Sequence, residues 1–213
     1  MFPAQVSAIL ERLEQAGFAA YAVGGCVRDT LLGRVPQDWD VATSARPEQT
    51  AALFAGRSIP TGLQHGTVTV RQEGLSVEVT TFRADGPYSD HRRPDAVYFS
   101  DSLAEDLCRR DLTVNAMAMD RRGVLTDLHG GREDLRRGLL RCVGEPDRRF
   151  DEDALRIMRT LRFASVLGFT VEERTAAALH RCAPLLGSIA AERLLSEMDR
   201  LLCGRYVLPV LLA

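Results

Sequence analysis

Residues 21–43 combine a glycine pair with two closely spaced aspartates, and this combination limits the folds open to the chain. An apolar run over 21–23 leads directly into Gly24 and Gly25. The spacing predicts a short helix over 27–32, and the next apolar run carries Asp38 and Asp40. Because side chains two residues apart on a strand point to the same face, both carboxylates are expected together at one end of a sheet.

This segment offers two kinds of chemistry. Two carboxylates held close together repel each other, and a divalent, oxygen-preferring cation such as magnesium relieves that repulsion. Paired glycines before a helix allow backbone N–H groups to approach a phosphate closely. Either half alone is a weak signal, because diglycines are common in turns and surface strands often alternate acids with apolar residues. Together they predict a phosphate site beside a metal pair.

A third acid, Glu78, lies in a strongly predicted strand. Residues 65–70 alternate well, 72–74 form a turn, and 75–83 return as the second arm of a hairpin. Glu78 is either a glutamate on a solvent-facing edge or, if its strand pairs beside Asp40, a third carboxylate at the same cations. Three carboxylates around two magnesium ions suit nucleotidyl transfer.

The remaining pattern divides the chain near residue 144. Before it, strands and helices alternate; after residue 146, only helical periodicity is predicted. Helices are predicted at 3–16, 47–54, 103–119, 133–136, 151–166, 172–182 and 190–203, strands at 18–23, 124–128 and 139–143, and a polar, mobile loop at 84–101. The apolar stripe formed by Leu179, Leu185, Leu186, Ile189, Leu194, Leu195 and Met198 is expected to be helical core.

Composition excludes some classes of protein. The net charge of −2 and pI near 6.1 give no overall basic signal of a nucleic-acid binder. All 27 basic residues are arginine, which is more typical of genome composition than of function. The five scattered cysteines favour reduced thiols and a cytoplasmic location. No apolar run reaches membrane-spanning length, and the longest near the end, 206–213, is too short.

The glycine pair, the Asp-x-Asp pattern and the later acid resemble the DNA-polymerase-β-like nucleotidyltransferases. Residues 21–40 are similar to the first motif of class II tRNA nucleotidyltransferases and bacterial poly(A) polymerases, 109–116 to their second motif, and 152–169 to their nucleotide-template motif. The motifs occur in the family's order and extend over about 18–169.

The resemblance implies an α/β (α+β) fold: a polymerase-β-like nucleotidyltransferase head with a mixed, mostly antiparallel sheet over 1–144, followed by an all-helical neck over 145–213. It implies template-independent addition of CMP and AMP, from CTP and ATP, to the 3′ end of tRNA with Mg²⁺. The implied metal ligands are Asp38 and Asp40, and Glu78 joins them as a catalytic residue. The residues implied to organise the triphosphate are Gly24, Gly25, Arg28 and Asp29.

The second motif supplies ribose and triphosphate contacts by the same resemblance. In isolation, Arg109, Arg110 and Asp111 would be interpreted as a surface ion pair near a helix end. In this context they are expected to contact the nucleotide, with Asp111 accepting from the 2′-hydroxyl. Asn115 either joins by hydrogen bonding or fixes the local backbone.

The third motif is expected to select the base. On one helical face, Glu152 and Asp153 can both approach Arg156, and the simpler alternative is a stabilising salt bridge. In the family, the acid and arginine read the Watson–Crick edges of CTP and ATP. Arg159 and Arg162 are expected near the same face, where they either contact phosphate or pack against neighbouring residues.

Other features leave alternatives. The loop over 85–95, with its basic portion 90–93, either moves with the template helix or is simply solvated. CC-only enzymes of the family have shortened loops, so the resemblance implies that a loop of full length favours CCA or A addition. His65 is expected to be structural. Because family members are longer, we expect missing C-terminal domains or a homo-oligomer. Rival functions are a poly(A) polymerase, an A-only adding enzyme, or a non-catalytic RNA- or nucleotide-binding module.

Overall fold

The computed structural model describes residues 2–88, 91 and 96–212, which form two compact units. The sheet unit contains 2–85, 97–110 and 115–129; the helical unit contains 86–88, 91, 96, 111–114 and 130–212. The chain therefore passes between the units several times, and 130–144 belongs to the helical unit. The domain boundary near residue 144 stays a prediction.

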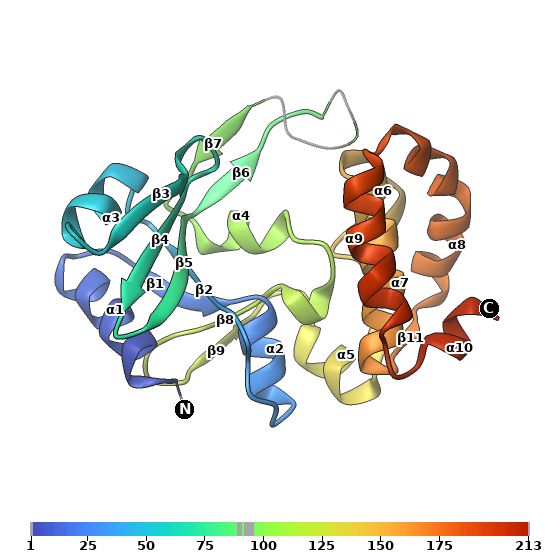
Figure 1. Ribbon diagram of the computed structural model, residues 1–213, viewed down its shortest axis with the longest axis horizontal. Coiled ribbons are helices and arrows are strands. Elements are labelled where there is room, and N and C mark those ends of the chain that lie inside the picture. The colour runs from blue at the N-terminus through green and yellow to red at the C-terminus, as the bar shows by residue number, and fades with distance from the viewer. Residues whose placement is uncertain (1, 89–90, 92–95, 213) are drawn as a thin grey trace. The chain divides into compact units, whose positions relative to one another are not determined.

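A seven-stranded sheet forms the centre of the sheet unit (Figure 1), with the order β3-β4-β5-β2-β1-β8-β9. β2 and β5 are parallel and all other neighbours are antiparallel, which confirms the predicted mixed, mostly antiparallel sheet. The strands are β1 (Ala20–Val23), β2 (Trp39–Thr43), β3 (Ser58–Gly62), β4 (Thr67–Gln72), β5 (Leu75–Thr81), β8 (Met117–Met119) and β9 (Leu125–Asp127).

The β4–β5 hairpin forms where the sequence predicts it. Gln72 pairs with Leu75, so Glu73 and Gly74 are the two loop residues, with φ of 47° and 82°. Positive φ at both positions matches a type I′ turn, whose twist fits two antiparallel strands. This turn sets the register that places Val77 and Val79 in the core and leaves Glu78 exposed.

Three helices pack against the sheet (Figure 1). The helix α1 (Ala4–Gln15) buries Val6, Ile9, Leu10 and Leu13 and contacts β1, β2, β4 and α3 (Pro47–Leu53). The helix α2 (Gly25–Leu31) contacts β1, β2 and β8. The fully buried apolar side chains of α1 lie at helical spacing, which is why the predicted first helix forms.

The helix predicted over 103–119 is wrong beyond its first turns. The helix α4 (Leu103–Cys108) ends early. The 3₁₀ turn η2 (Thr113–Asn115) and then strand β8 follow it. Met117, Ala118 and Met119 are all buried because β8 pairs with β1 on one side and β9 on the other. A short apolar run buried on both faces cannot be distinguished from a helix by its periodicity.

The loop predicted over 84–101 also needs correction. β6 (Arg83–Asp85) and β7 (Val97–Phe99) pair as an antiparallel ribbon. Of the region expected to move with the template helix, 89–90 and 92–95 lie outside the described residues. His91 is described: its Nδ1 lies 2.8 Å from the carbonyl oxygen of Asp151, within the helical unit.

The helical unit is built mainly on α7 and the helices packed against it. Figure 1 shows α9 alongside α7, and these two share the apolar cluster of Ala154, Leu155, Met158, Ile189 and Leu201. The elements are α5 (Gly131–Arg137), β10 (Leu139–Leu140), α6 (Pro146–Glu152), α7 (Leu155–Leu167), β11 (Thr170–Val171), α8 (Glu173–Cys182), η3 (Ala183–Ser188), α9 (Ala191–Leu202) and α10 (Val207–Leu211).

The neck predicted over 145–213 is helical apart from the two-residue strand β11, which pairs in parallel with β10, part of the strand predicted over 139–143. The apolar stripe is only partly core: Leu179 and Ile189 are buried, whereas Leu195 and Met198 are 60% and 39% exposed. The helix α9 places these two side chains on the face turned away from its neighbours.

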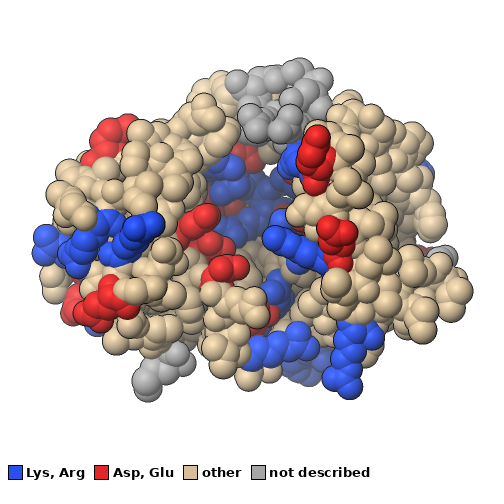
Figure 2. Space-filling view, in the orientation of Figure 1, with Lys and Arg blue, Asp and Glu red and all other residues tan. Residues whose placement is uncertain are grey.

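Charged side chains of both signs lie on the face of the sheet unit that Figure 2 shows. Because the chain has no lysine, every blue side chain in Figure 2 is an arginine, and on the visible face of the sheet unit red acidic groups adjoin the blue ones. Within 2–88, 91 and 96–212, no helix combines the length and apolarity needed to cross a bilayer.

Candidate active site

Asp40 and Glu78 stand side by side on adjacent strands of the sheet unit. They are register partners on the parallel strands β2 and β5, so their side chains leave the same face of the sheet. Ala42, two residues after Asp40, points to this same face and packs in a core cluster with Val23 and Leu107. The pairing of β5 beside β2 is the arrangement that brings Glu78 next to Asp40.

Negative charge accumulates at Asp40. Burial, the charge of Glu78 and the charge of Asp38 raise the pKa of the Asp40 carboxyl to about 6, against the opposing effect of Arg110. Asp38 is exposed and immediately precedes β2. The structure therefore brings the two aspartates of the Asp-x-Asp pattern within electrostatic reach of each other, although Asp38 precedes the strand on which both were expected.

The donor set at this position fits a hard divalent cation. Its available atoms are carboxylate oxygens, and the raised pKa of Asp40 reflects burial together with the negative charges of Glu78 and Asp38, which a cation would offset. In the described part of the chain, no cluster of three or more His, Cys, Asp and Glu side chains is close enough to hold a metal. Asp38 and Asp40 suit Mg²⁺, which is often held by one or two carboxylates and completed by water and substrate phosphates. Glu78 as a further ligand stays a prediction.

Gly24 forms a cradle next to these carboxylates. Its φ of 76° and ψ of −134° are accessible to glycine but strained for other residues. A Cβ at this position would lie 3.0 Å from Nη1 of Arg110 and 3.8 Å from Oδ2 of Asp40. The missing side chain thus leaves space between a cationic group and an anionic group, directly before the first residue of α2, Gly25.

Arg28 is fixed in the same unit by two partners. Its Nε and Nη2 donate to the two carboxylate oxygens of Asp29 at 2.9 and 3.0 Å, and its Nη1 donates to Oδ1 of Asn115 at 2.7 Å. Arg28 is buried, and its Nη2 lies 3.6 Å from where a Cβ on Gly25 would be. Asp29 and Asn115 therefore orient Arg28 at the glycine pair.

Arg109 and Arg110 share one buried carboxylate, that of Asp106. Arg109 donates to Oδ1 through Nε and Nη2 at 3.0 and 2.7 Å, and Arg110 donates to Oδ2 through Nη2 at 3.0 Å. The two guanidinium groups lower the pKa of Asp106 despite its burial. Sequence reasoning missed Asp106, although its separation of three and four residues from the arginines is the spacing of helical ion pairs.

Asp111 lies in the helical unit, where it pairs with Arg159. Arg159 donates to Oδ2 through Nε and Nη2 at 2.9 and 2.6 Å, and Oδ1 accepts from the backbone N–H of Leu112 at 2.8 Å. The segment 111–114 is held by an isolated bridge from Leu112 to Cys142 and a bond from Thr113 N–H to Arg141. The second motif therefore contributes residues to both units.

The single helix predicted over 151–166 is wrong, because the chain breaks at Asp153 between α6 and α7. Asp153 is extended, with φ of −141° and ψ of 101°. The predicted contact still forms across the break: Nη1 of Arg156 donates to Oε2 of Glu152 at 2.9 Å. Oε1 of Glu152 accepts from Arg148 and Arg149, and Nη1 of Arg156 also donates to the carbonyl oxygen of Arg149.

Asp153 is placed differently from Glu152. Its Oδ1 accepts from the N–H of Leu155 at 3.2 Å and lies 3.9 Å from Nη2 of Arg193. Burial raises the pKa of its carboxyl, while Arg193 and Arg156 oppose that rise. The contact of Asp153 with Arg156 is thus electrostatic, and a direct salt bridge joins Arg156 only to Glu152 in the described residues.

Arg162 favours the packing alternative. Its Nε bonds to the buried carboxylate of Glu197 on α9, and its guanidinium lies 4.0 Å from the ring centroid of Phe163. Burial lowers the pKa of Arg162 against the charge of Glu197. His65 is likewise structural in its contacts, because its carbonyl oxygen accepts from Arg83 at 2.6 Å.

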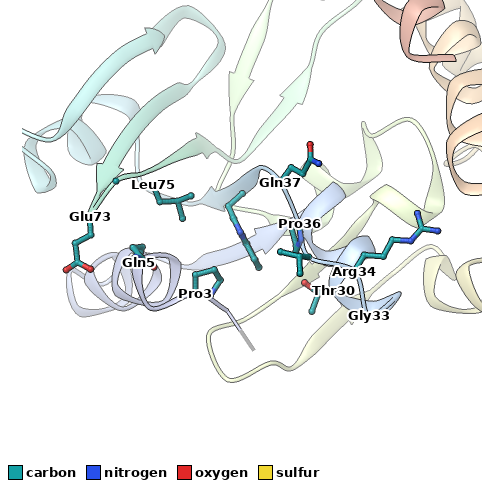
Figure 3. Close-up of a pocket in the computed structure, with 12 residues that line it drawn as sticks. Pro3, Gln5, Thr30, Gly33, Arg34, Pro36, Gln37, Glu73 and Leu75 are labelled. Carbon is teal, nitrogen blue, oxygen red and sulfur yellow. The ribbon is translucent and has the colours of Figure 1, made fainter. Parts of the chain in front are cut away.

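A separate open pocket of about 670 Å³ lies elsewhere in the sheet unit (Figure 3). Trp39 is the only residue of β2 that lines it, and none of the predicted site residues does. Its lining residues are Pro3, Gln5, Thr30, Gly33, Arg34, Val35, Pro36, Gln37, Trp39, Glu73, Gly74 and Leu75.

Comparison with known proteins identifies relatives along nearly all of the chain. The family of the poly(A) polymerase head domain matches residues 20–141, and a probable RNA-binding region of polymerase A matches 168–212. The chain is 51% identical over 207 residues to a CCA-adding enzyme of Geobacillus kaustophilus, covering 97% of this chain and 51% of that protein. It thus spans about half the length of the curated relatives it matches.

Two solved structures are also similar. A Bacillus stearothermophilus CCA-adding enzyme in complex with CTP has a TM-score of 0.91 and 47% identity, covering 99% of this chain and 51% of that one. A tRNA nucleotidyltransferase complexed with a primer tRNA and an incoming ATP analogue has a TM-score of 0.76 and 31% identity, covering 95% and 58%.

Proposed function

This chain belongs to the poly(A) polymerase head-domain family, and we propose that it is the catalytic part of an enzyme that adds CMP and AMP, from CTP and ATP, to the 3′ end of tRNA. The observation that carries the proposal is the carboxylate group at Asp40 beside the Gly24 cradle and Arg110. Relatives named CCA-adding enzymes, one bound to CTP, support the choice of reaction. The scattered cysteines favour a cytoplasmic location.

The sheet unit performs the transfer in this proposal. Backbone N–H groups at Gly24 and Gly25, together with Arg28, Arg109 and Arg110, bind the triphosphate. Asp38 and Asp40 would hold Mg²⁺, with Glu78 beside them. When bound, divalent cations activate the attacking hydroxyl and neutralise the departing pyrophosphate. Asp29 and Asn115 hold Arg28 in place, so that its charge is available at the glycine pair without rearrangement.

The helical unit selects the nucleotide. Arg156 offers donors to cytosine acceptors, and Asp153 accepts from the exocyclic amine that cytosine and adenine share. UTP and GTP would leave the buried Arg156 and the partly buried Asp153 unpaired, which is a strong basis for exclusion. Because both oxygens of Glu152 already accept from arginines, we assign Glu152 to orienting Arg156 rather than to reading the base.

Asp111 and Arg159 contact the ribose in the same proposal. Oδ2 of Asp111 accepts two bonds from Arg159 and Oδ1 accepts from the N–H of Leu112, so the carboxylate is fixed in place, and we assign it to accept from the 2′-hydroxyl. Arg159 holds the carboxylate in a fixed orientation through two bonds. A deoxyribonucleotide would lack the hydroxyl that this site is arranged to bind.

The test is incubation of a tRNA lacking its CCA end with each nucleoside triphosphate alone and in combination, read at nucleotide resolution. We expect two CMP residues from CTP alone, one further AMP when ATP is added, and no product from UTP or GTP. The Arg156→Ala variant should accept UTP or GTP, with discrimination lowered by about tenfold or more.

The other outcomes identify the rival functions. Long adenylate tails would indicate a poly(A) polymerase, and AMP added only to a tRNA that already ends in CC would indicate an A-only enzyme. No product with any nucleotide would favour a non-catalytic binding module. Unchanged discrimination in Arg156→Ala would contradict the role of Arg156 in base selection.

A further inference from the structure

We propose that Asp106, which lies outside every motif discussed above, is a positioning residue that fixes Arg110, and with it Arg109, for binding the nucleotide triphosphate. The inference rests on the proposed function and extends it to a residue that does not itself touch the nucleotide. The residues involved all belong to the sheet unit.

Among the described residues, the hydrogen-bond partners of the Asp106 carboxylate are two arginines. The residue is 1% exposed, and the hydrogen bonds to both oxygens come from Arg109 and Arg110. A buried carboxylate is costly unless charged donors satisfy it. Breaking one side of such an arrangement therefore disturbs the other side strongly.

The helix α4 explains why the contact is well defined. Ser102 caps its first turn by accepting from the N–H of Glu105, and Leu107 is fully buried in the core cluster with Ala42. Asp106 is next to Leu107, near the end of this anchored helix. Arg109 and Arg110, three and four residues later, can reach its carboxylate without long-range rearrangement.

Arg110 has further hydrogen-bonding capacity on the side facing the candidate site. Its Nη2 is used by Asp106, whereas its Nη1 faces the position that a Gly24 side chain would occupy. Its Nε is buried and has no hydrogen-bond partner among the described residues. Oδ2 of Asp40 lies near the same Gly24 position, so Arg110 stands between the buried anchor and the carboxylates of the site.

The charges of the group suit an anionic ligand. Asp106 contributes one negative charge and the two arginines contribute two positive charges, so one positive charge remains beside the glycine pair. A fixed guanidinium loses less conformational entropy on binding phosphate than a mobile one. Asp106 thus fixes the geometry of the two arginines without cancelling their combined positive charge.

The test measures the dissociation constant for CTP in the presence of Mg²⁺ for the wild-type chain and the variants Asp106→Asn, Arg110→Ala and their double mutant. Asp106→Asn preserves shape while removing the charge that fixes both arginines. We expect about a tenfold loss of CTP affinity in each single variant, a smaller loss for CMP, and no further loss in the double variant.

Glu105→Gln is the matched control, because it removes an exposed carboxylate from the same helix, one residue before Asp106, without removing the buried one. It should leave both the fold and the CTP affinity unchanged. The inference is overturned if Asp106→Asn binds CTP like the wild type, if its effect and that of Arg110→Ala simply add, or if Glu105→Gln weakens CTP binding equally. Failure of the wild-type chain to bind CTP would instead overturn the proposed function together with this inference.

Discussion

The side chain of Asp40 shows how local chemistry and tertiary pairing combine at the residue scale. The glycine pair and the Asp-x-Asp pattern could be predicted because their meaning is local to residues 21–43. The role of Glu78 could be predicted only by assuming that strand β5 pairs with β2, because that pairing places Glu78 beside Asp40. Asp106 was missed because a buried carboxylate three and four residues before two arginines has the same sequence pattern as an ordinary surface ion pair.

Asp40 should make stability depend on pH in a defined direction. Its pKa of about 6 in the folded chain exceeds the usual value for aspartate, so the folded state binds this proton more tightly than the unfolded state. The stabilisation by the proton is therefore present at low pH and is lost as pH rises through about 6. Without divalent cations, we expect Asp40→Asn to melt at a higher temperature than the wild type at pH 7.5.

The difference in melting temperature between Asp40→Asn and the wild type should shrink as the pH falls toward 5, because the wild-type carboxyl then becomes protonated. Thermal denaturation of both proteins across this range, without and with Mg²⁺, provides the measurement. Added Mg²⁺ should raise the wild-type melting temperature at pH 7.5 more than that of the variant. A difference in melting temperature that stays constant with pH would contradict the raised pKa of Asp40.

At the element scale, sequence patterns predicted the elements that form through local interactions and failed for those that depend on pairing with distant segments. The helix α1 and the β4–β5 hairpin follow from periodicity and turn chemistry. The structure of 103–119 could not be predicted in this way, because strand β8 is buried between β9 and the distant strand β1. The break at Asp153 also could not be predicted, since the residues on either side are good helix formers and no glycine or proline marks the position.

The end of α7 provides a stability test at this scale. Gly168 has φ of 74°, and a Cβ there would lie 2.8 Å from the Tyr206 ring. Gly168→Ala should therefore lower the free energy of unfolding by about 2 kcal/mol or more, combining backbone strain with displacement of a packed ring. The measurement is chemical denaturation of the variant and the wild type.

Gly144→Ala is the control for Gly168→Ala, because Gly144 belongs to the same unit and has φ of 70° but no atom within 4 Å of a Cβ. It should show the backbone cost of about 1 kcal/mol without the packing cost. Equal losses in the two variants would show that contact with Tyr206 does not contribute to the effect.

At the scale of the whole molecule, the sequence predicted the mixed sheet and the helical C-terminal part, and it located the residues of each motif. It could not predict that the second motif contributes Arg109, Arg110 and Asn115 to one unit and 111–114 to the other. That division follows from backbone bonds of 111–113 to 141–143, which join segments about thirty residues apart. Short motifs carry no signal for such pairing.

The central claim is that the carboxylates at Asp40 catalyse nucleotidyl transfer, and the most direct measurement is the rate of labelled CMP transfer from CTP to a tRNA lacking CCA. We compare the wild type, Asp40→Asn and Asp101→Asn, the last removing an exposed carboxylate paired with Arg46 in the same unit. Asp40→Asn should lower the rate by at least about a thousandfold, since several kcal/mol of catalysis depend on charge at this position. Asp101→Asn should transfer CMP at the wild-type rate, and chelation of Mg²⁺ should stop transfer by the wild type and by Asp101→Asn. Near-normal transfer by Asp40→Asn, with its fold intact, would contradict the account.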